Sequence, residues 1–537
     1  MILTPCSFIL ASTMAHWADQ IADRIIRRQG NGAVLTCASG ISPSGPVHVG
    51  NLRDIITIWF AAKALQDRNI PVRLIHSWDD FDRFRKVPEN IPKSFIEFIG
   101  RPLSKVPDPH DQYPSYAARY ESAFESSLLE MGITLSFLRQ TQLYESGIYS
   151  EAIHEAVQAR KTVYDILSSF KTKTESAEAK EAFFPLTIYC DRCGRDTTRI
   201  LSWAESETAL SYRCDTCHYD GGVNLKTARN IKLPWKVDWA MRWRHEKVVF
   251  EPGGKDHATA GGSFEVSSEI SKKIFHYDPP IFQPYEFIGL KGVTGKMSGS
   301  SGLLLTPADT LKVYQPELLL WVFAKTPPNR AFDLILDDGI ERLYDAFDRA
   351  SQAEPVSREI AVSKILGRTV HPVPFKHLVS FSGIIDGNLL ALEKMLVRIG
   401  IAYKKEDFEE RLKKATHWIA HYAPHAQISL LEKRHEDYFR TLSPKEKNDV
   451  ASLDHWLTNT SEFGLDEVTQ QVYEIPKRGL TNELEWADAQ HRFFQIIYNL
   501  LFGRDKGPRL GTFLFAVPKE SYLHLLHFPD TPSADNG

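Results

Sequence analysis

The sequence lacks the features of a membrane protein and of a globally basic nucleic-acid binder. None of its apolar runs approaches the roughly 18 residues that a membrane-spanning helix needs. Its 537 residues carry a formal net charge of −4, so any contact with nucleic acid has to come from local patches. We also find no internal repeat and no low-complexity segment. With 43% hydrophobic and 25% charged residues, the composition is that of a soluble globular protein.

The chain also lacks a convincing secretion signal. The opening MILTPCSFILASTM is apolar in part, but no lysine or arginine precedes the apolar residues. Met14 begins the stretch MAHWADQIADRIIRR, which has the spacing of an amphipathic helix. We therefore expect residues 1–13 to be an N-terminal extension, with Met1 or Met14 as the start, and we expect a cytoplasmic protein.

Cysteine is scarce, yet four of the six cysteines form two pairs. Cys190 and Cys193 stand in CDRCG, and Cys214 and Cys217 stand in CDTCH, which is the spacing of a zinc ribbon. Two disulfides or four unrelated buried thiols are the alternatives, and the missing secretion signal weighs against disulfides. Four sulfur ligands would leave no open position on the metal, so we expect a structural Zn²⁺.

The apolar pattern changes along the chain and indicates how it is organised. Residues 33–78 are typical of a βαβ unit, with a strand at 33–39, a helix at 51–68 and a second strand from Pro71. From about residue 106 to 232 the pattern is broken by polar helices and the cysteine pairs at 190–217, which predicts an insertion. Short apolar runs resume over 233–305. Beyond Leu305 the spacing is helical throughout, and SPKE at 443–446 predicts a capping box.

The loop ASGISPSGPVHVGNLRD joins the first predicted strand to the helix. A glycine-rich turn that opens onto a helix N-terminus offers free backbone N–H groups and the positive end of the helix dipole, and both suit phosphate. His48 adds a side-chain donor there, and Gly50 allows a ligand to approach the backbone. The same residues would also suit a purely structural turn.

A second loop, GKMSGSSG, lies far downstream. It places Lys296 among glycines and the hydroxyl groups of Ser298, Ser300 and Ser301. A loop with one lysine can close on a polyphosphate and stabilise charge that develops in the transition state, although a solvated linker has the same composition. The two loops in this order on a βαβ frame are more specific than either alone.

At this point the chain resembles the class I aminoacyl-tRNA synthetases. HVGN is similar to their HIGH motif and KMSGS to their KMSKS motif, although Gly299 stands where the second lysine of KMSKS would be. The stretches ASGISPSG, SWDDFDRFRKVP, WKVDWAMRW, GKDHATAGG and GPRLGTF resemble the class I lysyl-tRNA synthetases of archaea and some bacteria. The resemblance runs from about Met14 to near the C-terminus.

The resemblance implies an α/β fold with a Rossmann-type, doubly wound parallel sheet. Its two halves would be residues 14–105 and 233–305, separated by the zinc-ribbon insertion at 106–232. A helical connecting region that contacts the tRNA stem would follow at 306–375, and an all-α anticodon-binding domain at 376–537. In this domain Arg504, Lys506 and Arg509 could contact RNA or merely solvate a turn.

The resemblance also implies a two-step reaction with ATP, Mg²⁺, L-lysine and tRNA(Lys), and no obligate protein partner can be inferred. Lysine and ATP would give lysyl-adenylate and pyrophosphate, and the lysyl group would then pass to the terminal ribose. His48, Asn51 and Lys296 would be catalytic: the first two would contact ATP, and Lys296 would hold the departing pyrophosphate. The residues expected at ATP are Pro43, Ser44, His48, Gly50, Asn51, Lys296, Met297, Ser298 and Ser300.

For the amino acid we expect Gly40 and Ser42 at the end of the first strand, because ligands gather at strand C-termini in doubly wound sheets. DDFD resembles the EDTD stretch of glutamyl-type relatives, so Asp79 would hold the α-ammonium; the alternative is that the three aspartates pair with Arg83, Arg85 and Lys86. Trp235, Trp239 and His257 are candidates for the far end of lysine, by cation–π attraction, or are core residues.

Other functions remain to be weighed. A glutamyl enzyme would need a buried arginine for its substrate's side-chain carboxylate, where GGKDHATAGG offers His257. A cysteinyl enzyme would keep an open position on its zinc. An adenylyltransferase that does not bind tRNA would not need the long helical region after residue 305, and a non-catalytic zinc-ribbon RNA-binding module would leave both loops unexplained.

Overall fold

The structure is a computed structural model that describes residues 15–30, 34–170, 176–293, 305–385 and 387–529. It divides into two compact units. Unit 1 holds residues 1–311, 316–334 and 353–366, and unit 2 holds residues 312–315, 335–352 and 367–537. The stretch 306–375 is therefore shared between the two units rather than forming one segment of its own.

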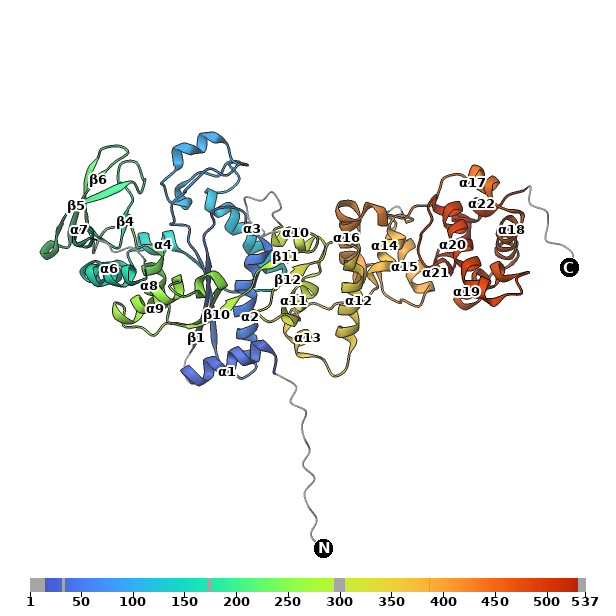
Figure 1. The fold of residues 1–537 in the computed structure, drawn as a ribbon, viewed down its shortest axis with the longest axis horizontal. Coiled ribbons are helices and arrows are strands. Elements are labelled where there is room, and N and C mark those ends of the chain that lie inside the picture. The colour runs from blue at the N-terminus through green and yellow to red at the C-terminus, as the bar shows by residue number, and fades with distance from the viewer. Residues whose placement is uncertain (1–14, 31–33, 171–175, 294–304, 386, 530–537) are drawn as a thin grey trace, which may run out of the picture. The chain divides into compact units, whose positions relative to one another are not determined.

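The core of unit 1 is a parallel sheet of five strands in the order β10-β9-β1-β2-β3. Its strands are β1 (Leu35–Ile41), β2 (Val72–Trp78), β3 (Ser136–Arg139), β9 (Val248–Gly254) and β10 (Ile281–Tyr285). From β1 the chain builds the sheet outward through β2 to β3, and later returns to add β9 and β10 on the other side of β1 (Figure 1). The order therefore reverses between β1 and β9, which confirms the doubly wound fold and puts the switch point there.

Helices pack around this sheet. They are α1 (Trp17–Gln29), α2 (Leu52–Gln66), α3 (Tyr116–Glu130), α8 (Trp235–Glu246) and α9 (Ser263–Lys273). Helix α2 contacts β1, β2 and β9, while α1 and α11 (Pro316–Lys325) pack against it as well. Because it is covered on several sides, α2 buries most of its residues, Ile58, Phe60 and Ala64 among them.

The insertion expected at 106–232 begins only after β3, because α3 and β3 in that range belong to the central sheet and its covering helices. From α4 onward the insertion has its own small sheets and helices. An antiparallel sheet joins β5 (Thr198–Ala204), β6 (Ala209–Cys214) and β7 (Asp220–Asn224), and β4 (Thr187–Ile188) pairs with β8 (Ile231–Lys232). Its helices are α4 (Gln140–Ser146), α5 (Ser150–Gln158), α6 (Arg160–Ser169) and α7 (Ala177–Ala182). Unit 1 is completed by α10 (Pro307–Leu311), α11, α13 (Arg358–Ser363) and the pair β11 (Ile288–Leu290) and β12 (Phe332–Leu334).

Unit 2 is helical in the part of the chain that the structure describes. Its helices are α12 (Gly339–Gln352), α14 (Phe375–Ser382), α15 (Leu389–Arg398), α16 (Lys405–Tyr422), α17 (Glu436–Thr441), α18 (Pro444–Asn459), α19 (Leu465–Glu474), α20 (Trp486–Phe502), α21 (Leu510–Ala516) and α22 (Leu523–Leu526). The capping box at the start of α18 is confirmed, with Ser443 and Glu446 bonded reciprocally. Within the described residues, no helix is long and apolar enough to span a membrane.

Candidate active site

A cavity of about 80 Å³ opens at the switch point of the sheet, where the carboxyl ends of β1 and β9 meet α8. Parallel strands leave their last backbone groups at one edge of the sheet, and the reversal in strand order spreads the crossing helices there. The residues lining the cavity are Ala38, Ser39, Gly40, Asp54, Ile75, Ser77, Asp79, Trp235, Trp239, Arg242, Trp243, Glu246, Val248, Glu251, Pro252, Gly253, Gly254, His257 and Tyr285. Of the residues expected at the amino acid, Gly40, Asp79, Trp235, Trp239 and His257 line this cavity, and Ser42 is not among the lining residues.

The aromatic wall of the cavity comes from α8 and from η5 (Lys255–Ala258), a 3₁₀ helix that follows β9. Trp235 and Trp239 stack with ring centroids 4.6 Å apart, and the His257 ring lies 5.6 Å from the first and 5.9 Å from the second. Trp235 is 37% exposed, whereas Trp239 is 5% exposed and also packs on Trp243. Trp239 is therefore a core residue that reaches the cavity, and Trp235 forms its outer wall.

Asp79 is joined to the cavity's arginine rather than to its sequence neighbours. Its Oδ1 lies 2.7 Å from Nη1 of Arg242, whose Nη2 lies 3.2 Å from Oδ2 of Asp238. The neighbouring Arg83 pairs instead with Asp196. Arg242 is the buried arginine that sequence reasoning missed, and these two carboxylates take up its charge.

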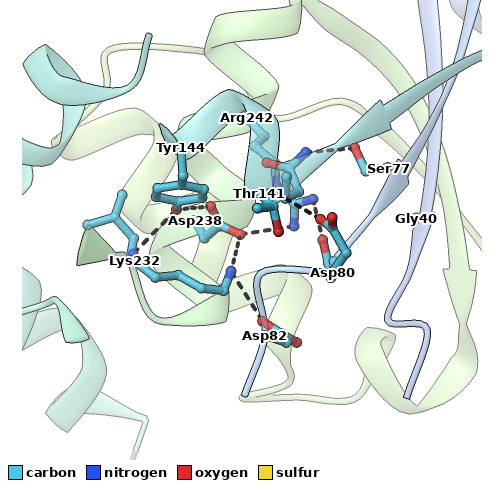
Figure 2. Close-up of polar contacts among 12 residues, drawn as sticks. Gly40, Ser77, Asp80, Asp82, Thr141, Tyr144, Lys232, Asp238 and Arg242 are labelled. Carbon is cyan, nitrogen blue, oxygen red and sulfur yellow. Dashed lines mark hydrogen bonds and ion pairs between the residues drawn. The ribbon is translucent and has the colours of Figure 1, made fainter. Parts of the chain in front are cut away.

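Figure 2 shows how this ion pair continues into a buried network. Lys232, from β8, lies 3.3 Å from Asp238 and 3.2 Å from Asp82, and the hydroxyl of Tyr144 donates to Asp238. Ion pairs with Arg242 and Lys232 lower the pKa of Asp238 against the effect of its burial, so this carboxylate stays ionised. The network fixes Arg242 in place from the side of the insertion.

Three further carboxylates, on Asp54, Glu246 and Glu251, line the cavity, and the sequence did not single them out. Asp54 lies in the first turn of α2 and Glu251 in the middle of β9, and each is 8% exposed. The backbone N–H of Gly40 donates to Oδ2 of Asp54 at 3.3 Å, and Nε1 of Trp243 donates to Oε2 of Glu251 at 2.6 Å. Burial raises the pKa of both carboxyl groups, and their mutual repulsion raises that of Asp54 further, to well above its usual range. In the sequence, Glu251 could have been recognised as a charged residue inside the apolar strand run VVFEPGG.

The histidine loop enters α2 through the 3₁₀ helix η1 (Val49–Asn51). His48 is the residue before η1, and its carbonyl accepts from the N–H of Asn51 at 2.9 Å. A Cβ on Gly50 would lie 2.8 Å from the His48 ring, so glycine leaves room there for the imidazole. Of the other residues expected at ATP, Pro43 is buried, and the carbonyl of Ser44 accepts from Tyr116 at 2.9 Å.

The second loop is only partly covered by the structure. Lys296, Met297, Ser298 and Ser300 lie outside the described residues. The carbonyl of Leu305, just after them, accepts a hydrogen bond from the N–H of Val49 at 2.8 Å. The chain therefore returns from the second loop directly to the histidine loop.

The paired cysteines come together in the insertion. The four Sγ atoms of Cys190, Cys193, Cys214 and Cys217 lie within 4.8 Å of one another and could hold a metal ion. The closest pairs are 3.6 and 3.7 Å apart, far longer than the ~2.05 Å of a disulfide bond. The CDRC and CDTC stretches form two tight turns of the same kind. In each turn, the backbone N–H four residues after the first cysteine donates to the carbonyl oxygen of that cysteine, at 2.8 Å from Gly194 to Cys190 and at 2.9 Å from His218 to Cys214.

A second and larger cavity, of about 600 Å³, belongs to unit 2 and is basic. Its lining includes Lys376, Arg504, Lys506 and Arg509, against the acids Glu341 and Asp505. Gly503, at φ 69°, ends α20, and Gly507 lies against Tyr498 with no space for a Cβ, so the glycines shape the arginine-bearing loop. Burial and nearby cations lower the pKa of His377 to about 4, which leaves its ring neutral at physiological pH.

The sheet with its switch-point cavity and histidine loop is that of a class I aminoacyl-tRNA synthetase, as the comparisons also show. A glutamate tRNA ligase from Elizabethkingia meningosepticum has a similar fold, with a TM-score of 0.50 at 12% identity over 92% of this chain and 98% of that chain. Residues 15–371 match the family model described as tRNA synthetases class I (K).

Relatives of similar length are found in two domains of life. The "Lysine--tRNA ligase" of Pyrococcus horikoshii is 36% identical over 533 residues, covering 96% of this chain and 99% of the relative. The "Lysine--tRNA ligase" of Streptomyces coelicolor is 35% identical and covers 95% of this chain and 98% of the relative. The chain belongs to the family of class I tRNA synthetases (K).

Proposed function

We propose that this protein is a lysine–tRNA ligase, which activates L-lysine with ATP and transfers it to tRNA(Lys). The observation that carries the proposal is the switch-point cavity, which combines an aromatic wall with acidic side chains. Aromatic faces and carboxylates both attract an ammonium group, and lysine carries two. The buried arginine that a glutamate substrate would need is present as Arg242, but Asp79 and Asp238 already neutralise it.

In the first step, a carboxylate oxygen of lysine bonds to the α-phosphorus of ATP as the bond to pyrophosphate breaks. We assign His48 and Asn51 to the phosphates, because the loop delivers them to the N-terminal end of α2, where the helix dipole favours an anion. Lys296 would hold the departing pyrophosphate, supported by the contact of Leu305 with Val49. Mg²⁺, which class I synthetases use with ATP, would neutralise phosphate charge. Pro43, Ser44, Gly50, Met297, Ser298 and Ser300 would complete the ATP site.

The amino acid would lie in the cavity with its backbone at the strand ends. Gly40 leaves the end of β1 open, and Asp79 would hold the α-ammonium while it stays paired with Arg242. Trp235, Trp239 and His257 would enclose the side chain. Ser42, which is half-buried beyond the end of β1, would contact the substrate from outside the cavity.

In unit 2, we assign the basic cavity to single-stranded RNA. Phosphates need cations, and unpaired bases need space beside rings and hydrogen-bonding groups. The cavity offers both, with Lys506 and Arg509 at its loop and Phe513 in its lining. The anticodon loop of tRNA(Lys) is the occupant that fits a ligase of this class.

For the cysteine cluster we propose a structural Zn²⁺. Four thiolate sulfurs arranged on two matching turns are the donor set that Zn²⁺ prefers, and they would leave no open position for substrate. The metal would hold the insertion together and take no part in the chemistry.

The decisive test of the function is ATP–pyrophosphate exchange with each of the twenty amino acids, with and without tRNA. Of the twenty amino acids, we expect only lysine to support exchange. We also expect tRNA(Lys), but not tRNA(Glu), to be charged. Exchange with glutamate or cysteine would overturn the specificity. Exchange that proceeds with lysine while no tRNA is charged would indicate an adenylyltransferase instead.

A further inference from the structure

The cavity at the switch point holds more acidic groups than its cations balance. Four carboxylates line it, on Asp54, Asp79, Glu246 and Glu251. Asp79 is paired with Arg242, and Glu246 lies 2.7 Å from Nη1 of Arg73. Among the described residues, no ion pair joins a cation to Asp54 or to Glu251.

This imbalance points to the side chain of the ligand rather than to its backbone. The charges of the α-ammonium and the α-carboxylate of a free amino acid cancel, so an amino acid with a neutral side chain brings no net charge to its site. Two buried carboxylates without a cation are costly in an empty cavity, and a side-chain cation removes that cost. In a site for a neutral or acidic amino acid, these two carboxylates would have no side-chain cation to bind.

We propose that Asp54 and Glu251 bind the ε-ammonium group of lysine and select lysine against neutral amino acids of the same length. This inference rests on the proposed function and deepens it. The two carboxylates approach from different elements, α2 and β9, and each has one oxygen fixed by an N–H donor, from Gly40 and from Trp243. The aromatic wall of Trp235 and Trp239 adds cation–π attraction for the same ammonium group, and the carboxylates supply the opposite charge.

The arrangement links lysine binding to proton uptake and release. Burial raises the pKa of both groups, and repulsion from Glu251 raises that of Asp54 further, so the empty pair holds a proton. A bound ammonium favours the ionised forms and lowers these pKa values, so binding releases a proton at any pH between the values of the free and bound pair. The titratable and charged groups that line the cavity with the pair are Asp79, Arg242, Glu246, His257 and Tyr285.

The first test compares lysine with norleucine, which has the same chain length and no ε-ammonium, by competition in the exchange assay. In the wild type we expect lysine to bind far more tightly than norleucine. Asp54→Asn or Glu251→Gln should weaken lysine by at least roughly 30-fold, the size expected when one partner of a buried charge pair is removed, and leave norleucine almost unchanged. Glu246→Gln is the matched control, because this carboxylate lines the same cavity but is already paired, and we expect it to keep the wild-type preference.

The second test needs no substitution. Calorimetric titration of the wild-type protein with lysine, in two buffers of different ionisation enthalpy, should show protons released on binding near neutral pH, and titration with norleucine should show none. Equal proton counts for the two ligands, or variants that fold and keep the lysine preference, would overturn the assignment. If the wild type exchanges pyrophosphate with lysine but these results fail, only this inference falls; if it does not respond to lysine, the proposed function falls as well.

Discussion

The switch-point cavity of unit 1 and the basic cavity of unit 2 differ in charge and in size. The cavity of unit 1 is small, about 80 Å³, and is lined by aromatic rings and acids; the cavity of unit 2 is about 600 Å³, and its lining carries more Lys and Arg side chains than acids. The charge of each cavity is opposite to that of its proposed ligand, which is an ammonium group in unit 1 and a nucleic-acid strand in unit 2. The comparison shows why a chain with a net charge of −4 can still bind RNA: the local field, and not the total, decides.

The largest effect should come from the histidine loop, because our proposal assigns it to the chemistry of unit 1 alone. His48→Ala should lower the rate of lysine-dependent pyrophosphate exchange by roughly a hundred- to a thousandfold, the usual loss when a preorganised donor to a transition state is removed. Affinity for tRNA(Lys), measured by filter binding, should stay the same. His110→Ala, at an exposed site, is the control. Wild-type exchange in His48→Ala would make the loop a structural turn.

The next effect separates the two cavities. The double variant Lys506→Ala, Arg509→Ala should weaken tRNA(Lys) binding by roughly tenfold or more at low salt, and reduce the slope of log affinity against log salt by about 0.7 for each phosphate that the variant no longer neutralises. Exchange of pyrophosphate without tRNA should be unaffected. Lys413→Ala, an exposed lysine of the same unit, is the control. An unchanged salt slope would remove the basic cavity from RNA binding.

A smaller effect tests the aromatic wall. Trp235→Ala should raise the KM for lysine several-fold, to about 30-fold at most, since a cation–π contact contributes roughly 0.5–2 kcal/mol. Its melting temperature should change little, because Trp235 is 37% exposed. Trp239→Ala should instead destabilise the fold by about 3–5 kcal/mol, as expected for a buried tryptophan. If both variants behave alike in KM and in thermal unfolding, the distinction between wall and core is wrong.

The smallest effect on catalysis is expected at the metal. Metal analysis should find one Zn²⁺ per chain, and Cys214→Ser should lose it and loosen the insertion, seen as faster proteolysis there. The initial exchange rate should remain close to that of the wild type. Asp215→Asn, on the same turn but without a ligand atom in the cluster, should keep both metal and stability. A protein free of metal but equally resistant to protease would contradict the zinc assignment.

The fold could be predicted because its signals are local or belong to recognisable motifs. The βαβ unit over 33–78, the capping box at Ser443 and the cysteine spacing each depend on a few neighbouring residues. The residues that motifs marked as candidates for the amino-acid site, and that line the cavity, are Gly40, Asp79, Trp235, Trp239 and His257; their contact with the substrate stays a prediction.

What the sequence could not provide is the partner of each charge. Asp79 and Arg242 are separated by 163 positions, and only the packing of α8 against β9 brings them together. For the same reason Asp54 stands in the sequence as one charge on a helix, although α2 is covered on several sides and its first turn faces the cavity. Gly50 was expected to admit a ligand, and in the structure it makes room for the His48 ring.

The hydrogen bond between Val49 and Leu305 has a kinetic consequence. The segment 294–304 begins after Val293, which is bonded to Leu290 at the end of β11, and finishes at Leu305, which is bonded to Val49. The chain joined to Leu305 is thereby held beside the histidine loop, and groups tethered in this way meet a ligand at an effective concentration on the order of millimolar or above. On the proposed function, a nucleotide held at the histidine loop would therefore be met by the neighbouring chain in an intramolecular encounter rather than a bimolecular one.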